Sequence, residues 1–216
     1  MDEALEAPEV EPVPDTLWER LRGEPERAPE FMALAAAERF APAAERWAAI
    51  TLPHHGPREA AEIAYRKHVL RSGVEGAAAG LGGAFTIVPD LAALAWIQGR
   101  MVFFIAAAHG FDPRHPMRPA ELLTLQGIYP TPAEARVGLD GAGTSLAVQF
   151  VQSKRGGDGQ LVARLAKLVG RKVAKRALLK AVPVLSSPVS AVQNRAATAD
   201  LGKRALLYYG GPPGSL

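Results

Sequence analysis

Apolar positions along this chain recur every three or four residues, which is the spacing of one face of a helix. The alternating pattern of a strand never continues for more than a few residues. Alanine and leucine, both strong helix formers, fill most of the apolar segments. The pattern therefore predicts an all-α protein.

Proline and glycine divide the first half of the chain into predicted helices. Residues 15–50 should form short helices with breaks near Gly23 to Pro25 and at Pro42, because proline removes a helical hydrogen bond. The stretch TLPHHGP that follows predicts a loop. Its last residue, Pro57, suits the first turn of a helix expected to run to about residue 88.

A second apolar helix is expected after Pro89. Asp90 is suited to cap its N-terminus, and Gly110 can end it in the left-handed conformation that glycine tolerates. Together with the helix before Pro89 it would form a helical hairpin. We therefore predict a multi-helix bundle around a central, glycine-rich, apolar helical hairpin.

The second half of the chain is divided in the same way. The stretch FDPRHPMRP predicts a loop followed by a short helix. The sequence Thr131-Pro132-Ala133-Glu134 is a capping box, which predicts a helix from 132 to about 152. A glycine-rich joint at 156–159 precedes a basic helix, and a break at 183–188 separates it from a last helix ending at Gly210.

The two ends of the chain differ from its middle. Residues 1–14 alternate acidic side chains with prolines and cannot bury enough apolar area to offset the entropy of ordering. We expect a flexible acidic tail over 1–14, a single helical domain over 15–210 and a disordered tail over 211–216.

The composition excludes several classes of protein. The sequence contains no cysteine, which removes disulfides, thiolate zinc sites, cysteine-ligated iron–sulfur clusters and cysteine nucleophiles. Its acidic start differs from the positively charged leader of an exported protein, so we expect a cytoplasmic protein. No motif predicts a bound cofactor.

Four glycines lie on one side of the helix that precedes Pro89. They are Gly73, Gly76, Gly80 and Gly83, at spacings of three, four and three. Each costs about 1 kcal/mol relative to alanine, which close approach of another helix usually offsets. We favour packing against the second helix in a soluble core over a membrane-inserting hairpin. A phosphate-cradling loop is disfavoured because no strand precedes the glycines.

The apolar text from 76 to 108 has two formal charges, Asp90 and Arg100. The uncharged run before Asp90 is shorter than the roughly 20 residues that cross a bilayer, so a simple transmembrane helix is not predicted. One interpretation is a buried hairpin in which Asp90 caps a helix. The other is an interfacial or re-entrant hairpin with Asp90 at its tip and Arg100 paired or snorkelling.

The helix after residue 160 is predicted to be amphipathic, with leucines on one side and a cationic face on the other. The basic residues are Arg164, Lys167, Arg171, Lys172, Lys175, Arg176 and Lys180. A solvated surface, an anionic lipid surface and pairing with the acidic N-terminus all remain open. Nucleic acid is disfavoured because no helix-turn-helix, RNA-recognition or zinc signature accompanies these charges.

The histidines give little support for catalysis. A metal site would require His54 or His55 to meet Asp112 or His115 across a long stretch of chain, and loop or surface positions are the simpler interpretation. Neither a Gly-x-Ser-x-Gly elbow nor a His-Glu-x-x-His helix occurs. The catalytic residues, if any, stay unknown, and no metal site is predicted.

The order of these elements resembles the EcsC protein family. The resemblance covers roughly residues 58–210: a glycine-spaced apolar helix, an acidic residue, a second apolar helix and a closing Gly-Phe-Asp. It matches Gly76, Gly80, Gly83, Asp90, Gly110, Asp112 and, near the end, Asn194. The chain departs from the family pattern at Ser186-Ser187-Pro188, where small, glycine-rich text is usual.

The resemblance implies an uncharacterised protein and transfers no catalytic residue. The family takes its name from a protein encoded beside an ABC transporter. Our first hypothesis is a non-enzymatic, membrane-associated accessory or regulatory protein that binds an anionic membrane surface or a membrane protein. The second is a hydrolase-type enzyme using Asp90, Asp112 and histidines, and the third is a structural interaction module that binds another protein or a second copy of itself.

Overall fold

The computed structural model describes residues 12–79, 87–141, 157–170 and 187–211. Over these residues every regular element is a helix and none is a strand, so the prediction of an all-α bundle is confirmed. In chain order the α-helices are α1 (Asp15–Gly23), α2 (Ala28–Ala79), α3 (Ile87–Ala108), α4 (Arg118–Leu125), α5 (Pro132–Leu139), α7 (Gly157–Val169) and α9 (Ser187–Gly210). A short 3-10 helix, η2 (Pro25–Arg27), follows α1 at the predicted break.

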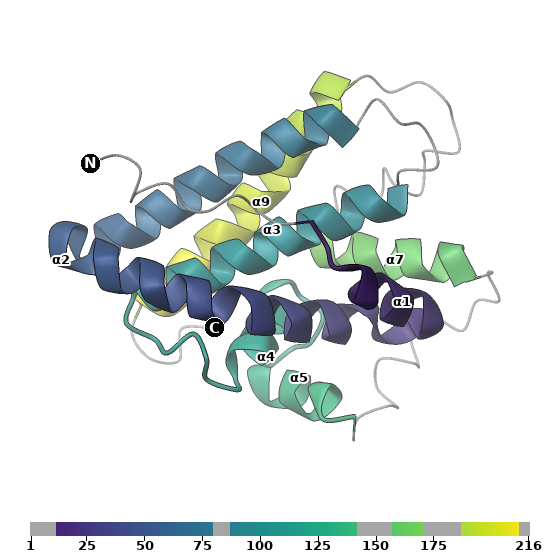
Figure 1. The fold of residues 1–216 in the computed structure, drawn as a ribbon, viewed down its shortest axis with the longest axis horizontal. Coiled ribbons are helices and arrows are strands. Elements are labelled where there is room, and N and C mark those ends of the chain that lie inside the picture. Colours follow the sequence, from purple (N-terminus) through teal and green to yellow (C-terminus); the bar gives the residue numbers. More distant parts are fainter. Residues whose placement is uncertain (1–11, 80–86, 142–156, 171–186, 212–216) are drawn as a thin grey trace.

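Helix α2 consists of two arms joined at Gly56 (Figure 1). Gly56 has φ 69° and ψ 170°, a left-handed conformation that glycine adopts without steric cost. The helix start predicted at Pro57 is confirmed, but the predicted loop is wrong, because helix continues to His55 and one residue makes the turn. The two arms diverge from the kink, and α3 lies between them in this view (Figure 1).

The break predicted at Pro42 is also wrong, because α2 runs straight through it. A proline in a helix interior costs about 3 kcal/mol through its missing N–H and its ring. Here the neighbouring face of α2 buries Phe40, Ala44 and Trp47 in the core. Each large apolar side chain contributes about 1.5–3 kcal/mol on burial, which is enough to hold the helix together across Pro42.

Helix α3 lies at the centre of the bundle and packs against α2, α7 and α9 (Figure 1). Its aromatic side chains interleave with the first arm of α2, with ring centroids 4.6 Å apart for Phe40 and Trp96 and 5.2 Å apart for Trp47 and Phe104. These buried rings account for much of the core. These contacts come from the first arm of α2 and not from the helix that precedes Pro89, so the predicted glycine-rich hairpin stays a prediction.

The ends of α3 differ in how well the sequence predicted them. Helix begins at Ile87, so Asp90 lies in its first turn and is not the N-cap that we expected, although a carboxylate there still favours the positive end of the helix dipole. Gly110 ends α3 as predicted, with φ 81°. The N–H of Phe111 donates to the carbonyl of Ala106 at 3.1 Å, which completes a Schellman cap.

Helix α5 starts as predicted but is much shorter. The hydroxyl of Thr131 accepts a hydrogen bond from the N–H of Glu134 at 3.2 Å, so Thr131 is the N-cap. The helix ends at Leu139 instead of about 152, because Gly141 takes a left-handed φ of 76°. Residues 142–152 of the predicted helix lie outside the described residues.

Helix α9 lies across α2 and α3 (Figure 1). A Cβ added at Gly202 would lie 2.5 Å from Cδ2 of Tyr65 and 3.1 Å from the sulfur of Met101, so only glycine lets these three helices approach so closely. The end predicted at Gly210 is confirmed. Helix α7 buries Leu161, Leu165 and Leu168 as its apolar face requires.

Candidate functional site

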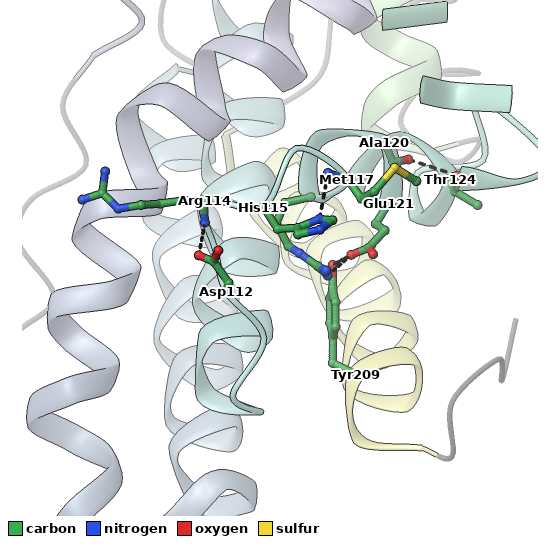
Figure 2. Close-up of polar contacts among 9 residues, drawn as sticks. Asp112, Arg114, His115, Met117, Ala120, Glu121, Thr124 and Tyr209 are labelled. Carbon is green, nitrogen blue, oxygen red and sulfur yellow. Dashed lines mark hydrogen bonds and ion pairs between the residues drawn. The ribbon is translucent and has the colours of Figure 1, made fainter. Parts of the chain in front are cut away.

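The loop from 109 to 117 joins α3 to α4 and contains two residues matched to the family, Gly110 and Asp112. The side chain of Asp112 accepts a hydrogen bond from the backbone N–H of Arg114 at 2.8 Å. Nδ1 of His115 accepts one from the N–H of Met117 at 3.2 Å. Figure 2 shows both contacts, and both side chains are exposed. Asp112 and His115 therefore hold two local turns, and their side chains do not combine into one reactive group.

Arg114 ties this loop to α2. Its Nε donates to the carboxylate of Glu45 at 2.6 Å, and both side chains are more than half exposed. An exposed ion pair contributes about 0–1 kcal/mol, so this contact selects a loop position and adds little stability.

A buried polar network lies beneath the loop, between α4 and α9. The carboxylate of Glu121 accepts a hydrogen bond from the hydroxyl of Tyr209 at 2.7 Å and pairs with the guanidinium of Arg118. Figure 2 shows Tyr209 extending from α9 towards Glu121 on α4. Burial, with the adjacent Glu121 charge, raises the pKa of Tyr209 well above its usual value, so the phenol remains a donor.

Aromatic rings close this network. The ring of Phe111 packs edge-on against Tyr209 with centroids 5.2 Å apart, and the guanidinium of Arg118 lies 5.2 Å from the Phe111 ring. The network thus joins the loop, α4 and the end of α9. Sequence reasoning missed Arg118 and Glu121, although their three-residue spacing on a short helix is a signal for an ion pair.

A second buried polar pair lies in the core between α2 and α3. Nη1 of Arg100 is 3.4 Å from Nε2 of His68, and the guanidinium stacks 4.6 Å above the ring of Phe104. Burial, then the nearby Arg100 charge, lowers the pKa of His68 to about 3. Burial, then the charges of Arg71 and Arg39, lowers the pKa of Arg100 to about 10.

The remaining histidines form no common site among the described residues. His54 is exposed beside the kink in α2, and Nδ1 of His55 lies 3.1 Å from the carboxylate of Glu59. His109 packs against Gly210 at the end of α9, where burial lowers its pKa. Over the described ranges, no three His, Asp or Glu side chains form a group that could hold a metal ion.

Among the described residues, the Asp and His side chains of the hypothetical enzyme do not converge on one place. Asp90 is half-buried in the first turn of α3, Asp112 is exposed in the loop and His68 is enclosed in the core. No two of these side chains share a hydrogen bond. Their separation follows from the helix packing, which the sequence alone does not reveal.

Of the four glycines on the predicted face, Gly73 is the one whose surroundings the structure describes, and its neighbour is α9. A Cβ at Gly73 would collide with the Arg195 side chain of α9, so Gly73 faces α9 and not the predicted partner α3. Gly76 lies within α2, but its surroundings are not described, and Gly80 and Gly83 lie outside the described residues. Asn194, beside Arg195, is half-buried on α9.

The predicted cationic face needs one correction. Lys167 is exposed, but Arg164 is buried, because three- and four-residue spacing places it beside Leu161 and Leu168 on the apolar side of α7. It lies near Tyr129, whose hydroxyl donates to Glu30 at 2.5 Å. Burial, then the hydrogen bond to Glu30, raises the pKa of Tyr129, and the Arg164 charge offsets only part of that rise. The other basic residues of this set lie outside the described residues: Arg171, Lys172, Lys175, Arg176 and Lys180.

Comparison with known proteins identifies the family of this chain. No curated protein and no solved structure matches the chain. A family model does match, and it spans residues 55–210, from the kink in α2 to the last residue of α9. The matched range includes the loop, the Glu121 network and the His68 pair, so we conclude that the chain belongs to the EcsC protein family.

Proposed function

We propose that this chain is a non-enzymatic accessory protein that associates with the cytoplasmic face of a membrane. The observation that carries the proposal is the basic segment that begins in α7, and the character of α3 limits how the protein could meet lipid. Residues Val88–Ala108 have a mean hydropathy of 1.7 and sufficient length to cross a bilayer, yet 94% of this stretch is buried inside the bundle. A helix that is apolar on all sides is compatible with a protein core and with a lipid-facing position.

Arg100 limits how α3 could meet lipid. It stands near the middle of the helix, where a charge at the centre of a bilayer costs about 2.5–3.5 kcal/mol or more. Within the bundle the guanidinium contacts His68 and the ring of Phe104. We therefore propose peripheral association in which the bundle stays folded, and not a spanning helix.

The membrane contact in this proposal is the basic segment that begins in α7. Lys167 is exposed, and Asp158 is the one acidic residue between Lys154 and Lys180 in the sequence. Each basic residue near an anionic bilayer contributes about 1 kcal/mol, so this segment could bind such a surface without insertion. A membrane protein, such as an ABC transporter, would then be the partner that the accessory role serves.

Vesicle flotation of the full-length protein tests the proposal. We expect flotation with vesicles of phosphatidylcholine and phosphatidylglycerol at low salt, and loss of flotation at high salt or with phosphatidylcholine alone. A test variant and a control variant would each replace four basic residues by glutamine. The test set is Lys167, Arg171, Lys172 and Lys175, and the control set, exposed elsewhere, is Arg46, Arg58, Arg66 and Lys203.

The two variants lose the same charge, so a difference between them reports the position of that charge. Four residues at about 1 kcal/mol each predict a roughly 10³-fold weaker partition for the test variant. The control should float nearly as well as the unmodified protein. Failure of the unmodified protein to float with either vesicle at low salt would contradict the membrane role.

A further inference from the structure

Arg100 is a buried charge, and one of its two terminal nitrogens makes no hydrogen bond among the described residues. The residue is 3% exposed, and its guanidinium carries five N–H donors. Nη1 makes the 3.4 Å contact with His68, whereas Nη2 is buried and has no hydrogen-bond partner among the described residues. Such a group is costly, because a buried charge needs a partner to offset its lost hydration.

His68 does not supply the missing negative charge. Its Nδ1 lies 2.7 Å from the carbonyl oxygen of Ala64, a contact that requires Nδ1–H to donate. Nε2 then presents a lone pair to Arg100, and the low pKa keeps the ring neutral at neutral pH. No carboxylate of the described residues forms an ion pair with Arg100.

Two further guanidinium groups lie near Arg100, one from each arm of α2. Arg71 is half-buried on the second arm and Arg39 is exposed on the first, and both charges act on Arg100. Both charges disfavour the protonated form of Arg100, and an anion bound beside it would offset that effect. Arg39 and Arg71 take part in other interactions, so Arg100 is the residue on which a ligand would depend.

We propose that Arg100 forms the inner end of a phosphate-binding site, in which Nη2 donates to a phosphate oxygen and the charges of Arg71 and Arg39 surround the group. Phosphate suits this arrangement because it offers several acceptor oxygens to a planar guanidinium and carries enough charge for more than one cation. The phosphate belongs to a free anion or to a lipid headgroup. This site does not depend on the membrane role proposed above.

Because Nη2 is enclosed, an anion reaches it only after a local opening of the side chains around it. Binding is therefore best detected at equilibrium, through thermal unfolding after incubation with sodium phosphate. Sodium chloride of equal ionic strength serves as the control for screening. At phosphate 100-fold above its Kd, the midpoint of the unmodified protein should rise by about 5–10 °C.

Variants separate specific binding from a general effect of anions. Arg100→Met keeps an unbranched side chain of similar length but removes the charge, so it should fold without phosphate and lose the phosphate-dependent rise. Arg100→Lys retains a charge but not the planar fork, and it should keep a reduced rise. Arg46→Gln removes an exposed charge elsewhere on α2 and should respond like the unmodified protein.

A second experiment, with phosphatidylcholine vesicles that contain phosphatidic acid, identifies the source of the phosphate. A rise with sodium phosphate supports a site for the free anion, and an Arg100-dependent response to the vesicles alone supports a lipid headgroup. No response of the unmodified protein to either probe would overturn the proposal, as would an equal response in Arg100→Met. A phosphate response in a protein that does not float would contradict the membrane role and leave this site standing.

Discussion

The network of Glu121, Arg118 and Tyr209 allows a quantitative test of how the end of α9 is held. Glu121→Ala removes the acceptor that both partners share, and it leaves the guanidinium of Arg118 buried without a carboxylate. Removing one partner of a buried ion pair costs about 3–5 kcal/mol. Tyr209→Phe removes one hydrogen bond to a charged group, which costs about 1.5–3 kcal/mol.

The two changes should not add. In the Glu121→Ala background the hydroxyl of Tyr209 has already lost its acceptor, so Tyr209→Phe should cost less than about 0.5 kcal/mol there. The expected coupling energy is then about 1–3 kcal/mol. In a domain of this size Tyr209→Phe alone should lower the melting temperature by about 3–12 °C.

Urea unfolding followed by circular dichroism measures these free energies. The dependence of the unfolding free energy on urea concentration should be the same in every variant, which shows that the variants unfold in the same way. Tyr65→Phe is a matched control, because its hydroxyl makes no hydrogen bond among the described residues. It should change stability by less than about 0.5 kcal/mol. Additive costs for Glu121→Ala and Tyr209→Phe would refute the shared-acceptor arrangement.

Three more predictions concern the core and the helix ends. Because the pKa of His68 is lowered to about 3, the unfolded chain takes up a proton between about pH 6.5 and 3 that the folded chain does not. The free energy of unfolding should therefore fall as the pH drops through that window, and it should fall less steeply in His68→Gln. Urea titrations across this pH range measure the difference. Gly202→Ala should cost about 1–3 kcal/mol by forcing a methyl group against Tyr65, whereas Gly23→Ala, with open space around it, should be neutral or slightly stabilising in the same assay. Gly110→Ala should cost about 1 kcal/mol, since its φ of 81° is strained for alanine, and an unchanged melting temperature would contradict the cap.

The sequence determined the features that depend on a few neighbouring residues. The all-α class, the break after Gly23, the N-cap at Thr131 and the left-handed cap at Gly110 all follow from helix propensity, proline and glycine geometry, and local hydrogen bonds. The apolar side of α7 followed from its spacing in the same way. The wrongly predicted break at Pro42 has the same local origin. The prediction counted the cost of a proline inside a helix but not the core packing that offsets it.

The tertiary structure alone decided which surfaces meet. Gly73 packs against α9 instead of α3, and Glu121 meets a tyrosine 88 positions away in the sequence. Arg100 joins a histidine from a different helix, where no acidic residue of the described chain neutralises it. Such contacts depend on how helices cross and on the total area they bury, and many pairings of amphipathic faces satisfy the same periodic pattern.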